Sequence, residues 1–210
     1  AGFIVQFYLK TFGTPAVAAY GVALRVEQLF LLPVFGLTGA LLPIAAQNFG
    51  ANQSERVRMA LLTCWKFGWV FMFVACPLLY FSAPLLMRSF TSDRAVIDIG
   101  VSYLRIDVFV LPIYMMLFAI NSFLQALKRP IWTLLIGIYR QAFGVAFFSF
   151  VFVYVWGFGV VGVWYGIATS VLTGMILSLF IANQVALPLV GGIFSGQETR
   201  KTNISNNHPI

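Results

Sequence analysis

The sequence predicts an all-α integral membrane protein with about six transmembrane helices. Of its 210 residues, 60% are hydrophobic and only 9% are charged, whereas soluble domains carry about 25% charged residues. The chain also divides into apolar runs long enough to cross a bilayer, which takes about 20 helical residues. Because the charged residues lie mostly between these runs, the net charge of +7 is attributed to membrane topology, and nucleic-acid binding is not expected.

The breaks between the apolar runs define the expected helices. Thr14 with Pro15 begins one helix and Ser54 with Glu55 begins another, as typical N-terminal signals. The segments "KRP" and "GFGVVG" separate later helices, and Pro188 is expected to end the last one. The expected helices cover about residues 1–10, 16–47, 55–82, 95–127, 130–156 and 160–187, the first being the end of a truncated span. They form a transmembrane bundle over 1–187, followed by a polar, disordered tail over 188–210.

Basic residues are unequally divided between the two sides of this bundle. One set of connections carries Arg56, Arg58, Lys128, Arg129, Arg200 and Lys201. The opposite set carries Lys10, Arg88 and Arg94. The positive-inside rule therefore places the first set and the C-terminal tail in the cytoplasm, as in a multi-pass protein of the inner (plasma) membrane.

Two helices keep charged residues inside apolar sequence. "LRVEQLFLLP" contains Arg25 and Glu27, and "LRIDVFVLP" repeats the pattern with Arg105 and Asp107. A charge at the centre of a membrane helix costs about 2.5–3.5 kcal/mol on insertion scales. Residues two apart lie about 200° apart around a helix, so neither pair forms a local salt bridge. Each charge therefore needs a partner elsewhere.

A polar stripe follows Asp107 along its predicted helix. Tyr114, Asn121 and Gln125 return close to the face of Asp107 at 100° per residue. A stripe of this kind predicts a protein-lined, wet cavity. We therefore expect Asp107 and Glu27 to bind a cation or substrate, with Tyr114, Asn121 and Gln125 as lining residues.

A second interpretation of the charged pairs remains open. The helix that carries Glu27 is longer than a bilayer requires, so both pairs could lie at the outer headgroup level. In the first interpretation, with Asp107 and Glu27 as cation ligands, Arg25 and Arg105 would hold the acids ionised or shape an outer vestibule. Arg140, which lies mid-helix, is assigned a structural or inter-helix role. A kink is expected near Pro33.

Small residues recur every four positions in the last expected helix. They are Gly162, Gly166, Ser170, Gly174 and Ser178. Small residues at this spacing let membrane helices approach closely, so the stripe predicts helix packing.

Enzymatic chemistry is not expected. The single histidine, His208, lies in the polar tail, and the acidic residues are scattered. A His/Cys metal cluster therefore cannot form, and a catalytic cluster at the membrane boundary is not evident. Neither a metal nor a cofactor is expected. The 35 aromatic residues (22 Phe, 8 Tyr, 5 Trp) are typical of lipid-facing surfaces, or alternatively of a cavity for flat organic cations.

Three segments resemble the MATE (multidrug and toxic compound extrusion) family. "GTPAVAAYGVALRVEQLFLLPVFGLTGALLPIAAQNFGA" (Gly13–Ala51) is similar to the eighth transmembrane segment of that family. "NSFLQALKRP" (Asn121–Pro130) and "FGVVGVWYG" (Phe158–Gly166) look like the ends of its tenth and eleventh segments.

The resemblance implies a fold and an activity. MATE proteins have twelve spans in two six-helix bundles, so the chain is expected to be the C-terminal bundle, partnered by an N-terminal bundle that it lacks. The family exports small organic, often cationic, substrates in exchange for Na⁺ or H⁺. Acidic residues that one branch carries in its seventh and tenth segments have no counterpart here, so the roles of Glu27 and Asp107 rest on the physical argument.

Two alternatives accompany the expected efflux by antiport. One is a lipid-linked oligosaccharide flippase of the same superfamily, which would show a larger and more cationic cavity. The other is a structural remnant that transports nothing. The isolated chain is itself expected to be inactive, because it provides only one wall of a cavity between two bundles.

Overall fold

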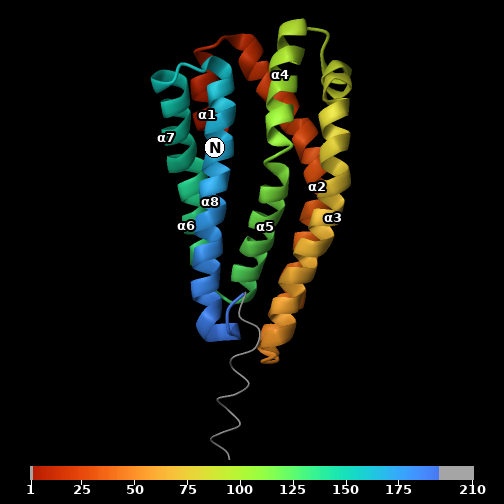
Figure 1. The fold of residues 1–210 in the computed structure, drawn as a ribbon, viewed down its shortest axis with the longest axis vertical. Coiled ribbons are helices and arrows are strands. Elements are labelled where there is room, and N and C mark those ends of the chain that lie inside the picture. Colours follow the sequence, from red (N-terminus) through yellow and green to blue (C-terminus); the bar gives the residue numbers. More distant parts are fainter. Residues whose placement is uncertain (1, 194–210) are drawn as a thin grey trace, which may run out of the picture.

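The computed structural model describes residues 2–193, which form a single helical bundle (Figure 1). The described part of the chain is helical throughout its regular structure, which confirms the predicted fold class. Its elements are α1 (Gly2–Lys10), α2 (Thr14–Gly50), α3 (Ser54–Phe90), α4 (Arg94–Asp107), α5 (Leu111–Ala126), α6 (Pro130–Ile138), η1 (Tyr139–Gly144), α7 (Val145–Phe150), η2 (Val151–Val155) and α8 (Gly159–Val190).

The lengths of these helices match a membrane protein. Within residues 2–193, four helical segments are long and apolar enough to cross a bilayer: α2, α3, the continuous segment Pro130–Val155, and α8. Helices α4 and α5, which bend by 57° at the break between them, are together long and apolar enough for a fifth crossing. The short α1 precedes these candidate spans.

Helix α3 is longer than the sequence predicts. We expected it to end near residue 82, with a polar-flanked connection afterwards, but it continues through Pro84 to Phe90. Ala83 and Met87 are fully buried, so the helix keeps an interior face past the expected end. The connection to α4 is therefore only residues 91–93, and the Asp93 side chain caps α4 by accepting a hydrogen bond from Ala95 N at 2.9 Å.

The span expected at 95–127 is broken into α4 and α5. Helix α4 ends at Asp107 and α5 begins at Leu111. Pro112 lies in the first turn of α5, where it cannot donate to the carbonyl of Val108 and its ring crowds that group. A turn bond from Val110 N to Asp107 O, at 2.7 Å, closes the break. The kink expected near Pro33 does not interrupt α2, which is continuous in the structure.

The last two spans also differ in detail from the expectation. Two π-helical segments, η1 and η2, interrupt the α-helical pattern between Pro130 and Val155. Helix α8 runs through Pro188 to Val190 and ends at Gly191, whose φ of 79° is a left-handed conformation that favours glycine. The predicted tail therefore begins later than residue 188, and its residues 194–210 lie outside the described part.

Helix α2 packs against α3, α4 and α5, and α8 packs against the two π segments, α7, α5 and α4. The turns 51–53 and 127–129 lie at the same end of the bundle as the C-terminus of α8 (Figure 1). At this end, Arg58 Nε donates to the carbonyl oxygen of Ile193 at 2.7 Å. Arg56, Lys128 and Arg129 lie at the same end, which we call the basic end.

Candidate functional site

Two carboxyl groups are buried together inside the bundle. Glu27 lies in the middle of α2 and Asp107 is the last residue of α4, and they are 7% and 2% exposed. The two groups interact electrostatically. Burial inside the bundle does not fix the depth of the two acids along the membrane, so the cavity and the headgroup-level interpretations both stay predictions.

The two carboxyl groups have different hydrogen-bond environments. The Tyr103 hydroxyl donates to Glu27 Oε2 at 2.6 Å, joining α4 to α2. Asp107 Oδ2 is buried without a hydrogen-bond partner among residues 2–193. Burying a carboxyl oxygen without a hydrogen-bond donor costs free energy. Asp107 is therefore the carboxyl group that a bound proton or cation would stabilise more.

Three aromatic rings pack beside the acids. Tyr103 lies edge-on to Trp164 of α8, with 4.9 Å between the ring centroids, and edge-on to Tyr20 of α2, at 5.6 Å. Tyr20 stacks on Trp164 at 5.8 Å. The rings exclude bulk water from this part of the interior.

The basic partner of this region is Arg140. It lies in the π segment η1, with its guanidinium 5.3 Å from the centroid of the Tyr114 ring of α5, and it interacts electrostatically with Glu27. Its side chain also packs along Gly174 of α8, where an added Cβ would come within 3.3 Å of Arg140 Cγ and Cδ. We call Glu27, Asp107, Tyr103, Tyr114 and Arg140 the interior polar cluster.

The structure separates the remaining predicted lining residues from this cluster. Gln125 is exposed in the last turn of α5, about 21 Å of helix beyond Leu111, the first residue of α5. Asn121 is half-buried, and its Oδ1 has no partner among the described residues. The stripe that the periodicity predicts is thus divided, and only Tyr114 joins the acids.

Arg25 and Arg105 are exposed. Within residues 2–193, neither forms an ion pair with Glu27 or Asp107. Arg105 instead lies over the ring of Tyr80, 5.3 Å from its centroid. The basic group that faces the acids is Arg140, to which the sequence assigned a structural or inter-helix role.

Sequence reasoning missed Tyr103, Tyr20 and Trp164. A signal for two of them was present, because Tyr103 precedes Asp107 by four residues and Tyr20 precedes Glu27 by seven, which places each on the face of its acid. Trp164 comes from α8, so only the tertiary structure places it here.

The small residues of α8 lie where two helices approach closely. An added Cβ at Gly166 would lie 2.6 Å from the Ser149 backbone nitrogen, and one at Gly162 would lie 2.9 Å from the Phe152 carbonyl oxygen. The Ser170 hydroxyl donates to the Arg140 carbonyl oxygen at 2.7 Å. Ser178 is fully buried. These contacts hold α8 against η1, α7 and η2, and thereby position Arg140.

An apolar cavity of about 700 Å³, open to the outside of the bundle, lies beside the break between α4 and α5. Its lining includes Trp69, Phe73, Tyr80, Phe81 and Phe109, which give it a strongly aromatic wall. Val108, the residue after Asp107, is also part of the lining.

The interior polar cluster is suited to binding one small cation or proton. Intramembrane carboxyl groups with tyrosine donors and a nearby arginine are typical of ion and proton pathways. In the described part of the chain, no group of three or more His, Cys, Asp or Glu side chains could hold a metal ion. The fold and the cluster together define a multi-pass helical membrane protein with ionisable groups inside its bundle.

Comparison with known proteins identifies the family. The sequence model of the MatE family matches residues 1–155, and the chain belongs to this family. Its members are transporters. The chain is 33% identical over 147 residues to the FAD transporter of Shewanella oneidensis, covering 67% of the chain and 31% of that protein. It is 25% identical over 185 residues to the multidrug export protein MepA of Staphylococcus aureus, covering 88% of the chain and 37% of MepA.

Solved structures show the same fold. A multidrug resistance MATE family transporter of the MOP superfamily, in its inward-facing conformation, superposes with a TM-score of 0.80 at 21% identity, covering 89% of this chain and 44% of that one. A MOP superfamily transporter from Pyrococcus furiosus superposes with a TM-score of 0.82 at 21% identity. The superposition covers 89% of this chain and 43% of that one. The chain spans about a third of the length of the curated relatives.

Proposed function

We propose that the chain is the C-terminal bundle of a MATE transporter that exports small organic, often cationic, compounds across the inner membrane in exchange for H⁺ or Na⁺. The observation that carries this proposal is the interior polar cluster, in which Asp107 keeps an unpartnered carboxyl oxygen beside Glu27. Multidrug export by MepA, a relative of the chain, supports the substrate class.

The mechanism follows from the chemistry of the two carboxyl groups. Two acids in one water-poor region repel each other when both are ionised. Entry of a proton or of Na⁺ relieves that repulsion, and Tyr103 and Arg140 stabilise the charge that remains. Cation loading can then change the packing of α2 against α4, because the hydrogen bond between Tyr103 and Glu27 joins these helices. The N-terminal bundle would form the opposite wall of the substrate path.

The aromatic cavity beside the break supports a flat, lipophilic substrate. Phenyl and indole rings bind organic cations through their faces, with about 0.5–2 kcal/mol for each favourable contact. Because Asp107 immediately precedes Val108 in the cavity lining, a conformational change at the break would affect the acid and the cavity together.

Ethidium efflux by the complete transporter that contains this chain tests the proposal. We expect Asp107→Asn and Glu27→Gln each to reduce efflux at least about tenfold and to change its dependence on pH or Na⁺. The matched controls are Asp98→Asn and Glu55→Gln, because both acids are exposed and outside the cluster. Normal efflux with unchanged ion dependence in both cluster variants, at equal expression, would contradict the assignment.

A second candidate is export of a flavin nucleotide. The observation in its favour is the 33% identity to a protein named as an FAD transporter. Arg140 beside the Tyr114 ring offers the positive charge and the aromatic surface that such an anionic, planar molecule requires. Measuring FAD and ethidium export by the same transporter distinguishes the two, and Arg140→Gln should impair FAD export more than ethidium export if FAD is the substrate.

Two further alternatives make different predictions. A lipid-linked oligosaccharide flippase would require several cations around its cavity, whereas the described interior polar cluster has Arg140 as its basic member. A structural remnant would transport nothing even in the presence of an N-terminal bundle. We expect the 210-residue chain alone to be inactive, so drug/H⁺ exchange by the reconstituted chain would refute that expectation.

A further inference from the structure

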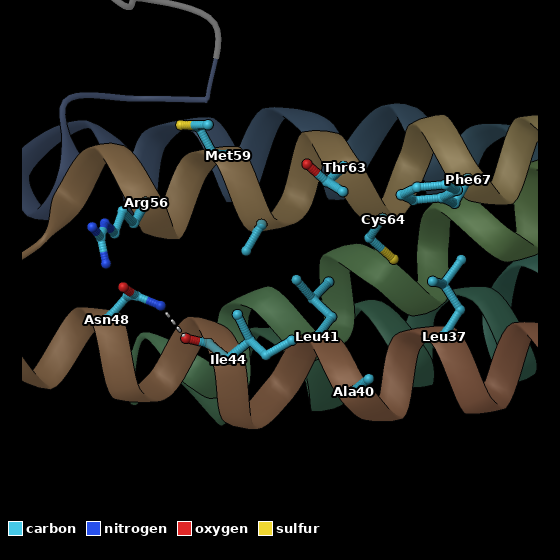
Figure 2. Close-up of a pocket in the computed structure, with 11 residues that line it drawn as sticks. Leu37, Ala40, Leu41, Ile44, Asn48, Arg56, Met59, Thr63, Cys64 and Phe67 are labelled. Atoms are coloured by element: carbon cyan, nitrogen blue, oxygen red, sulfur yellow. Dashed lines mark hydrogen bonds between the residues drawn. The ribbon is translucent and has the colours of Figure 1, made fainter.

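A groove on the outside of the bundle, between α2 and α3, has a polar end and an apolar body (Figure 2). Its volume is about 420 Å³. The apolar body is lined by Leu37, Leu41 and Ile44 from α2 and by Met59, Cys64 and Phe67 from α3. The groove lining shares no residue with the interior polar cluster, and the mechanism above does not use it.

The polar end of the groove is formed by two residues at the basic end of the bundle. Asn48 and Arg56 lie opposite each other there, on α2 and α3 (Figure 2). Asn48 Nδ2 donates to the Ile44 carbonyl oxygen at 2.8 Å, which fixes the amide. Arg56 is exposed, and among residues 2–193 its guanidinium has no hydrogen bond or ion pair. The positive charge of Arg56 therefore has no partner at the polar end of this apolar groove.

The length of the groove matches one leaflet of a bilayer. Arg56 and Phe67 are eleven residues apart on α3, and so are Leu37 and Asn48 on α2. Eleven helical residues span about 16 Å, and half of the hydrocarbon core is about 15 Å thick. The 37-residue helices α2 and α3 are longer than the hydrocarbon core is thick. We therefore place Arg56, two residues into α3, at headgroup level.

We propose that this groove is a binding site for an anionic glycerophospholipid of the leaflet at the basic end. The lipid phosphate pairs with Arg56 and an acyl chain lies along the groove toward Leu37 and Phe67. Charge complementarity favours an anionic headgroup, because Lys128 and Arg129 lie at the same end of the bundle. The groove lining contains no acidic side chain that could pair with an organic cation, and Arg56 would repel one, so an acyl chain fits the groove better than a cationic drug.

Native mass spectrometry of the purified 210-residue chain tests the headgroup contact. Phosphatidylglycerol and phosphatidylcholine with identical acyl chains are added separately in detergent. Each basic residue near an anionic headgroup contributes about fivefold to affinity, so we expect about fivefold tighter binding of phosphatidylglycerol. Arg56→Gln should abolish that preference. Arg88→Gln, which removes an exposed arginine at the opposite end of α3 and outside the groove, should retain it.

A second pair of variants tests the acyl-chain contact. Ala40 is an exposed groove residue, and Ala40→Phe places a ring inside the groove. It should lower the binding of both lipids, whereas Ala46→Phe, on an exposed position of the same helix outside the groove, should not. The proposal is overturned if Arg56→Gln keeps the preference, if Arg88→Gln loses it equally, or if Ala40→Phe binds both lipids normally. Displacement of bound lipid by ethidium would instead identify the groove as a drug site.

Discussion

The carboxyl groups of Glu27 and Asp107 lie in the same interior region, but only Glu27 has a donor for a buried oxygen. That donor, Tyr103, is itself held between Tyr20 and Trp164. A single hydroxyl therefore links the acid on α2 to the helix that carries the second acid. Loss of this hydroxyl leaves Glu27 buried without its partner.

We predict that Tyr103→Phe destabilises the protein by about 1–3 kcal/mol, the cost of leaving a buried acceptor without its donor. The ring packing is retained, so the loss isolates the hydrogen bond. Unfolding in detergent, followed by circular dichroism against temperature or denaturant, measures the change. The control is Tyr8→Phe, which removes the bond from a half-buried tyrosine to the Ala146 carbonyl oxygen and should cost less. Equal stability of Tyr103→Phe and the wild type would contradict the role assigned to this bond.

The elements of the bundle position the cluster through breaks and close contacts. The break after Asp107 leaves that residue at the end of α4, and the π turn η1 carries Arg140. π turns inside helices are frequent at functional sites, because they displace side chains from the regular α pattern. Glycine and serine residues on α8 then allow η1 and α7 to approach closely enough for Arg140 to reach Tyr114.

The close contact at Gly166 predicts a steric effect. Gly166→Ala places a methyl group 2.6 Å from the Ser149 backbone nitrogen, so α7 and α8 must separate. We expect a loss of about 1–3 kcal/mol in the free energy of unfolding, as for other overpacked sites. Gly137→Ala is the matched control, because its added methyl group meets nothing within 4 Å. It should be neutral or stabilising by up to about 1 kcal/mol. Equal behaviour of the two variants would show that the small-residue face does not set the packing.

For the whole molecule, the unequal distribution of basic residues predicts its orientation. The end that holds Arg56, Arg58, Lys128 and Arg129 should face the cytoplasm. The connection 91–93 lies at the opposite end (Figure 1) and should face outward. The lipid site would then lie in the cytoplasmic leaflet, where anionic lipids are abundant.

Single cysteines test this orientation. In a Cys64→Ala, Cys76→Ala background, which removes both native cysteines, Ser92→Cys should react with a membrane-impermeant maleimide in intact cells. Gln53→Cys should react only after the membrane is permeabilised. Both positions are exposed, so differences in labelling report the side of the membrane. The opposite labelling pattern would reverse the proposed topology and place the lipid groove in the outer leaflet.

The sequence predicted most helix positions to within a few residues because their signal is local. Apolar runs and the breakers around residues 11–15, 51–54 and 128–130 predicted most helix ends to within a few residues. The extension of α3 to Phe90 was missed, because Pro84 and nearby polar residues resemble a connection although Ala83 and Met87 are buried. The break at residues 108–110 was also missed, since proline is tolerated in α2 but ends the regular pattern before α5.

The sequence by itself determined that this is a helical membrane protein, that it resembles the MATE family, and that Glu27 and Asp107 are unusual acids in apolar surroundings. Composition, periodicity and the high cost of an intramembrane charge depend on the sequence alone, so each can be assessed without knowing the fold. Only the tertiary structure decided which groups meet those acids. It brought Tyr103, Tyr20, Trp164 and Arg140 together and left Gln125, Arg25 and Arg105 exposed, because contacts between helices depend on the helix break, the π turn and the small residues of α8.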